Sequence, residues 1–138
     1  MNLKDLIAVS GLPGLYKVAA NRSNGLIIEE VDSGKKRFAS VRKHQFTPLE
    51  SIAIYTVDDS VELAKVFGKM VEQLEDNPPP KTSAKSEVLR EYFLDVLPDH
   101  DEDRVAISDI KKVIKWFEFM REYNLMDAAD EDANQEEE

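Results

Sequence analysis

The sequence predicts an α+β protein in which a small SH3-like antiparallel β-barrel, residues 1–57, is followed by three helices. In the first part, short segments rich in aromatic and β-branched residues alternate with turn residues, as in antiparallel sheets. In the second part, apolar residues recur every three or four positions, which is typical of helices that bury one face. The hydrophobic content of 42% is enough for a packed core, so general disorder is excluded.

Four strands are expected in the first part, at residues 14–20, 25–31, 36–42 and 51–56. Asn24-Gly25 predicts a hairpin between the first two, because both residues tolerate positive φ. The residues before Gly11 are expected to form at most one helical turn, and residues 45–50 a loop with one 3₁₀ turn. Four short strands are too few for a sandwich, and they favour a strongly bent sheet that curls on itself.

The second part divides into a connecting helix at 58–77, a proline-rich linker at 78–82 and a helical hairpin at 83–126. Asp58, Asp59 or Ser60 is expected to cap the first helix, and Ser108 the last. The triproline in the linker favours polyproline II and acts as a semi-rigid spacer, which leaves the hairpin free to form a separate unit. Residues 127–138 contain seven acids and no base, and are expected to be a disordered acidic tail.

Charge is distributed unevenly along the chain. Residues 1–57 carry a net charge of +3, whereas the remainder carries −13, giving −10 overall. The acidic total disfavours non-specific nucleic-acid binding, so only the first part is a candidate for it. There is no cysteine, which excludes thiol chemistry and fits a reducing compartment, and no stretch is apolar enough to cross a membrane. We expect a cytoplasmic protein.

Candidate catalytic and metal sites are weak. Residues 99–103 place aspartates at the spacing of a calcium loop, but Arg104 occupies the position of the turn glycine and Ile110 that of the closing glutamate. This segment is therefore interpreted as a solvated acidic loop. His44 and His100 lie in different parts of the chain, the first in a basic loop and the second among carboxylates, and neither has the context of a hydrolytic triad. We expect no metal, no cofactor and no enzymatic activity.

Two surfaces are candidates for binding. One is a basic set around the third expected strand, where Tyr16, Phe38, Phe46 and Tyr55 could supply stacking faces for single-stranded nucleic acid. The other is the last helix, where Trp116 and Phe119 make the helix apolar over more than half its circumference. That face either packs on the barrel or meets a partner or a second copy of the chain. The basic set comprises Lys35, Lys36, Arg37, Arg42, Lys43 and His44.

Three sequence segments resemble a family of short uncharacterised bacterial proteins, known mainly from the Bacteroidetes lineage and described as domains of unknown function. The segments are Asn2-Leu3-Lys4-Asp5, Ser10-Gly11-Leu12-Pro13-Gly14-Leu15-Tyr16-Lys17 and Val105-Ala106-Ile107-Ser108-Asp109-Ile110-Lys111-Lys112. The resemblance covers nearly the whole chain apart from the acidic tail. It implies a bacterial cytosolic protein with an N-terminal β domain, and carries over no activity, cofactor or catalytic residue.

The sequence therefore favours a non-enzymatic binding or adaptor protein that contacts another protein through the barrel loops or the aromatic side of the last helix. The alternative is an RNA- or DNA-binding accessory protein that uses the basic set. In that case the acidic second part of the chain, with its tail, would compete for the cations, and removing residues 127–138 would strengthen nucleic-acid affinity.

Overall fold

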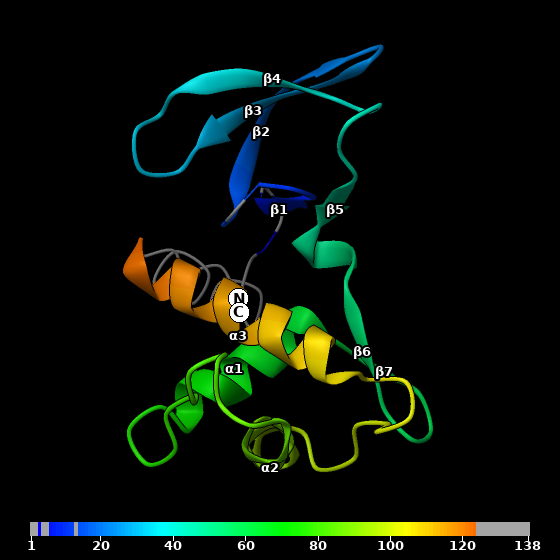
Figure 1. The fold of residues 1–138 in the computed structure, drawn as a ribbon, viewed down its shortest axis with the longest axis vertical. Coiled ribbons are helices and arrows are strands. Elements are labelled where there is room, and N and C mark those ends of the chain that lie inside the picture. The colour runs from blue at the N-terminus through cyan, green and yellow to red at the C-terminus, as the bar shows by residue number, and fades with distance from the viewer. Residues whose placement is uncertain (1–2, 4–5, 13, 124–138) are drawn as a thin grey trace, which may run out of the picture.

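The structure is a computed structural model that describes residue 3 and the ranges 6–12 and 14–123. Along its longest axis, β2–β4 lie at one end, β1 and β5 come next, and the three helices lie at the other end (Figure 1). Within the described residues, a five-stranded antiparallel sheet has the order β4-β3-β2-β1-β5. Its strands are β1 (Leu6–Val9), β2 (Tyr16–Arg22), β3 (Gly25–Glu30), β4 (Lys36–Ser40) and β5 (Phe46–Pro48).

The sheet is bent so that its two parts face one another. Ile7 and Val9 of β1 pack against Tyr16, Ile28 and Ala39 of the β2–β4 part, forming a small core inside the bend. The bend is the one that the sequence predicts, but β4 and β5 remain the two edges and do not pair with each other. The sheet is thus antiparallel and curled without being closed into a barrel, and the SH3-like barrel remains a prediction.

Three parts of the sheet differ from what the sequence predicts. Residues 6–9 form β1 and not a helical turn, because Leu6 and Ile7 pair with β2 and Ile7–Val9 pair with β5. Residues 46–48 form β5 and not a loop, and the expected 3₁₀ turn follows at Leu49–Ser51. The predicted hairpin is present, but its turn is Ser23–Asn24, with Arg22 and Gly25 paired across it.

The last expected strand joins a different sheet. Strand β6 (Ala53–Tyr55) pairs with strand β7 (Ser60–Glu62) in a separate two-stranded hairpin. Asp58 and Asp59 do not cap a helix; they form the turn of this hairpin, where the Asp59 amide donates to Thr56 Oγ1 and the Thr56 amide donates to the Asp59 carbonyl. Helix α1 (Leu63–Glu72) therefore begins later than predicted.

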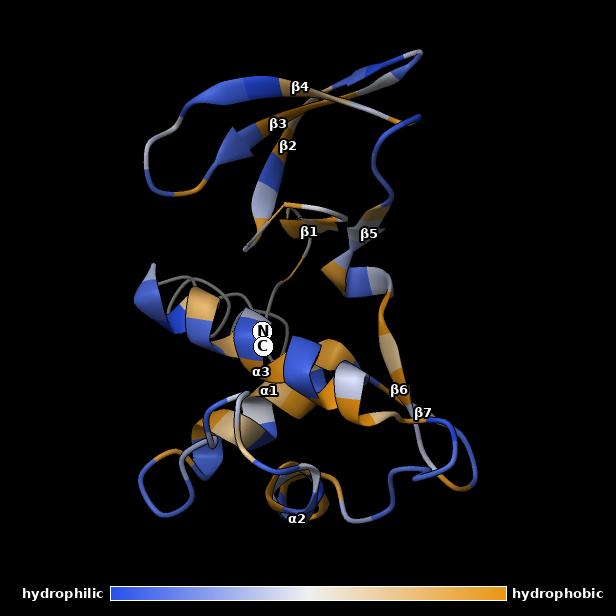
Figure 2. Ribbon diagram, viewed as in Figure 1, coloured by the Kyte–Doolittle hydropathy of each residue, from blue (hydrophilic) through white to orange (hydrophobic). Residues whose placement is uncertain are grey.

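The three helices and the sheet share one core. Helices α2 (Ser86–Val96) and α3 (Ile107–Glu122) follow the triproline, and α3 buries the apolar stripe that the sequence predicts. Phe67 of α1 lies 5.9 Å from Phe117 of α3 between ring centroids, and Leu3, Leu6 and Leu15 from the first part of the chain belong to the same cluster. Figure 2 shows hydrophobic residues on α1, α3 and β1, and hydrophilic residues over the outer loops. The hairpin after the triproline is packed against the rest of the molecule.

The start of α3 uses a different residue from the one expected. Ser108 lies within the first turn, and the N-cap is Ala106, whose amide donates to the Asp109 carboxylate over 3.0 Å. Asp109, at the N3 position, thus supplies the half of a capping box in which an acidic side chain accepts from the N-cap amide. The expected acidic tail lies outside the described residues.

Candidate binding groove

A groove of about 990 Å³ lies between β1–β5 and α3. Its walls are β1 with the loop that follows it, β5, one side of α3, and the triproline with the two residues after it. Side chains alternate along β1, so Leu6 enters the main core and Ile7 and Val9 enter the core inside the bend. Ala8 and its partner Thr47 therefore line the groove.

The loop after β1 is held in place by the β4–β5 turn. The amide of Ser10 donates to the Gln45 carbonyl over 3.0 Å, and the amide of Gln45 donates to Ser10 Oγ over 2.7 Å. His44 Nδ1 lies 2.7 Å from the Ser10 carbonyl, and because a carbonyl only accepts, this ring nitrogen carries the proton and donates. His44, expected to belong to a basic surface, is instead half-buried and fixes the loop that forms one wall of the groove.

The other wall is fixed by a close approach between Gly14 and Phe119. Gly14 has φ +76°, and a Cβ placed there would lie 2.5 Å from Phe119 Cε2. Only glycine leaves room for this ring, so the loop and α3 are fitted to one another at the groove. Phe119 also packs on Tyr123, with ring centroids 4.6 Å apart.

Trp116 and Phe119 are both half-buried against the main core and line the groove with the rest of their surfaces. Trp116 also lines a smaller hollow of about 240 Å³ beside β6. The sequence identified these two residues as a surplus apolar face on α3. The structure shows that the face is only partly covered, and that its uncovered portion forms the groove wall.

Apart from the buried Ile114, the remaining groove side chains on α3 are charged. Arg121 is paired with Glu118 at 3.3 Å, and Glu122 is the second carboxylate. Three lysines complete the lining: Lys112 and Lys115 on α3 and Lys81 after the triproline. Among the residues that the structure describes, none of the three forms an ion pair.

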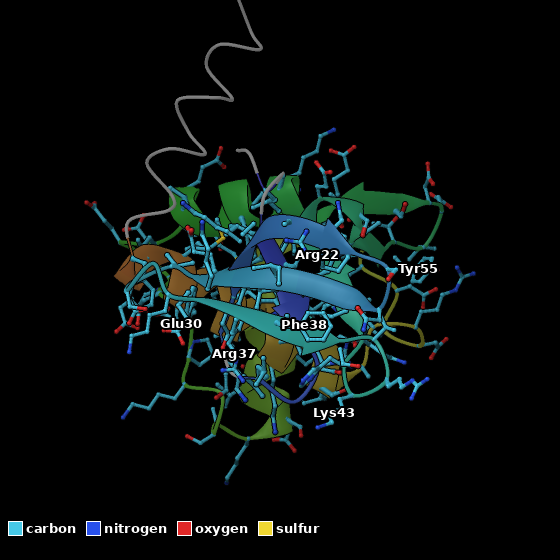
Figure 3. The ribbon with its side chains drawn as sticks, turned by 90° about the horizontal axis from the view of Figure 1, so that it is seen from above. Arg22, Glu30, Arg37, Phe38, Lys43 and Tyr55 are labelled. Atoms are coloured by element: carbon cyan, nitrogen blue, oxygen red, sulfur yellow. The ribbon has the colours of Figure 1, made fainter. Side chains whose placement is uncertain are left out.

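The predicted basic set is spread along β4, an edge strand. Lys35, Lys36 and Arg37 lie at its start, while Arg42 and Lys43 follow its end, all of them exposed. Figure 3 shows Arg37 and Lys43 apart along this edge, with Phe38 on the outer face of the sheet and the helices behind it. On that face Lys36 and Lys17 both lie opposite Glu29, which offsets part of their charge.

Most of the expected stacking rings are not available beside the basic set. Tyr16 is buried and Phe46 is partly buried in the core inside the bend, and Tyr55 lies on the other sheet, where Arg104 covers its ring at 5.0 Å. Phe38, which is 46% exposed, is the ring that remains.

The acidic loop contains a buried polar network that the sequence did not reveal. His100 is only 3% exposed, and its Nδ1 donates to the Leu97 carbonyl over 2.8 Å. Arg90 donates to His100 Nε2 over 3.0 Å and to the Val105 carbonyl over 2.8 Å. Because Arg90 cannot accept, Nε2 of His100 is the acceptor in this hydrogen bond. His100 is therefore not a solvated group among carboxylates but a structural link between α2 and the segment before α3.

The loop is also joined to the β6–β7 hairpin. Val57 donates its amide to the Asp99 carbonyl, and Asp101 donates its amide to the Tyr55 carbonyl. Asp101 pairs with Arg104 at 3.3 Å, so its carboxylate is already engaged. Within the described residues, no group of three or more potential metal ligands is found, and no helix is long and apolar enough to cross a membrane.

Residues 3–49 match DUF5606 and residues 52–120 match DUF6852, and each family is described as a domain of unknown function. A solution NMR structure of a Bacteroides vulgatus protein is 34% identical and has a TM-score of 0.73. The similarity covers 90% of this chain and 89% of that one. No curated protein matches the chain. The resemblance to Bacteroidetes proteins of unknown function is confirmed.

Proposed function

The chain belongs to a bacterial family that joins two domains of unknown function. From the groove, we propose that it is a non-enzymatic protein that binds an extended segment of a partner protein. The single observation that carries the proposal is a groove whose walls are fixed by Gly14, His44 and Phe119 while its aromatic surface stays partly open. Preformed, partly apolar grooves with a few charged groups are typical of binding sites.

Binding is favoured over catalysis by the polar groups in the groove. Its ionisable side chains are lysines, an arginine and glutamates, and no histidine is among the described residues that line it. Ser10 Oγ is used as an acceptor by the Gln45 amide, and the neighbouring His44 Nδ1 is engaged with the Ser10 carbonyl and not with this hydroxyl. We place the protein in the cytoplasm, which its lack of cysteine supports.

The test is site-specific photocrosslinking in the native cell from Thr47, an exposed groove residue of β5. Val88, which is exposed on α2, provides the matched control position. We expect one protein to be crosslinked from position 47 and not from 88. Thr47→Trp, which narrows the groove, should lower its capture from a second groove position, Lys115. Equal crosslinking from both positions, or crosslinks to a second copy of this chain, would contradict the proposal.

Nucleic-acid binding is a second candidate, favoured by one observation: five exposed cations flank Phe38 on an edge strand. Five phosphate contacts would give a steep salt dependence of affinity. Reversing Lys36 and Arg37 should then weaken binding of a short single-stranded oligonucleotide at least about tenfold at low salt, and an unchanged affinity would remove this candidate.

A further inference from the structure

We infer that the segment held in the groove is acidic and carries one large apolar side chain beside its carboxylates. This inference rests on the proposed function, because it specifies the chemistry of the partner segment in that same groove. Charge, apolar surface and length each contribute to it.

The charge of the groove opposes the charge of the chain. Four cations and two carboxylates line it, a net charge of +2 in a protein of net charge −10. Arg121 and Glu118 offset one another, so Lys81, Lys112 and Lys115 are the cations left for a ligand. A basic segment would be drawn to the acidic remainder of the surface, whereas an acidic one is attracted to the groove.

The apolar surface lies between the cations. Lys115 and Trp116 lie three and four residues after Lys112, so both are helical neighbours of Lys112, and all three line the groove. Phe119 and Ala8 extend the apolar wall. An aromatic or large aliphatic side chain can pack there while carboxylates one or two residues away reach the lysines.

The length of the site fits a short peptide. From Lys112 to Glu122 the helix rises about 15 Å at 1.5 Å per residue, which about five residues of extended chain can follow at 3.3 Å each. Glu118 and Glu122 lie on the same wall and repel any anionic ligand, so the carboxylates of the segment are expected beside Lys81, Lys112 and Lys115.

Trp116 is the one tryptophan of the chain, so its fluorescence reports on the groove directly. The full chain is titrated with the peptides GDEFDEG, GKKFKKG and GDEADEG and with a hexathymidylate. We expect GDEFDEG to shift the emission with an affinity at least about tenfold above the other three, and to weaken with added salt.

Charge reversal locates the site. Lys112→Glu with Lys115→Glu should lower the affinity for GDEFDEG about tenfold or more, while the equal reversal Lys35→Glu with Lys36→Glu on β4 should change it less than about twofold. If the double variant on α3 does not fold, Lys81→Glu tests the same attraction from the other wall.

The outcomes separate the two proposals. If GKKFKKG or hexathymidylate shifts Trp116 more tightly than GDEFDEG, the inference of an acidic peptide is wrong, while crosslinking from Thr47 to a partner would still uphold the groove as a binding site. If GDEFDEG shifts the emission only after residues 124–138 are removed, these acidic residues of the chain itself occupy the groove, and the inference of a partner segment is wrong. If no probe acts and Thr47 captures nothing, both fail.

Discussion

Replacing Gly14 with alanine tests how the groove is built. Gly14 has φ +76°, and an alanine Cβ there would lie 2.5 and 2.9 Å from two ring atoms of Phe119. The positive φ alone costs an alanine about 1 kcal/mol. Moving the Phe119 ring removes part of its burial, which adds about 1–2 kcal/mol, since full burial of such a side chain contributes about 1.5–3 kcal/mol. We therefore expect a destabilisation of about 2–3 kcal/mol.

Gly34 supplies the matched control. Its φ of +73° is nearly the same, but an added Cβ meets nothing within 4 Å. Gly34→Ala should thus cost only the backbone contribution of about 1 kcal/mol. Urea denaturation of both variants measures the difference, and in a Phe119→Ala background the cost of Gly14→Ala should fall to that of Gly34→Ala. Equal costs for the two single variants would refute the packing described here.

Three further results are expected, each measured by urea denaturation. Burial, and then the charge of Glu118, raise the pKa of Tyr92 to about 12 from 10.0. The folded state therefore keeps the Tyr92 proton to higher pH than the unfolded state does. The contribution of Tyr92 to stability is constant below pH 10 and falls by up to about 3 kcal/mol between pH 10 and 12. The Tyr92 hydroxyl is buried and finds no hydrogen-bond partner among the described residues. Tyr92→Phe should therefore be neutral or stabilising at pH 7 and should remove that part of the alkaline loss. A loss of more than about 1 kcal/mol at pH 7 would show a missed hydrogen bond. Arg90→Met leaves His100 Nε2 and the Val105 carbonyl without a donor and should cost about 2–3 kcal/mol, with Arg90→Lys recovering part of it; equal losses in both variants would argue against the hydrogen bonds.

Local patterns predicted the parts of the fold that depend on neighbouring residues. The stripe on α3 follows from helical periodicity, and the β2–β3 hairpin follows from turn chemistry, although its turn is Ser23–Asn24 and not Asn24-Gly25. The strands β1 and β5 were missed because each is short and is defined by pairing with the other across about forty residues. Asp58 and Asp59 form a hairpin turn and not a helix cap. The sequence alone does not separate the two roles, because aspartate favours both helix N-caps and turns.

The groove could be predicted only in part. Trp116 and Phe119 were found because helical spacing shows a surplus apolar face. The role of Gly14 could not be read, since it depends on a ring more than a hundred residues away in the chain. His44 and His100 look like surface residues in their charged surroundings. The Ser10 carbonyl that accepts from His44 and the Arg90 guanidinium that donates to His100 are brought to them only by the tertiary structure.

The most direct test of the central claim is an amide-resolved NMR titration of the labelled full chain with GDEFDEG and, separately, with short RNA and DNA oligonucleotides. We predict peptide-dependent shifts at the groove-lining residues 8–12, 14, 45, 47, 112, 114–116, 118 and 119, and only small shifts along β4. Shifts confined to residues 35–43, produced by oligonucleotides and not by peptide, would contradict it and move the function to the basic edge.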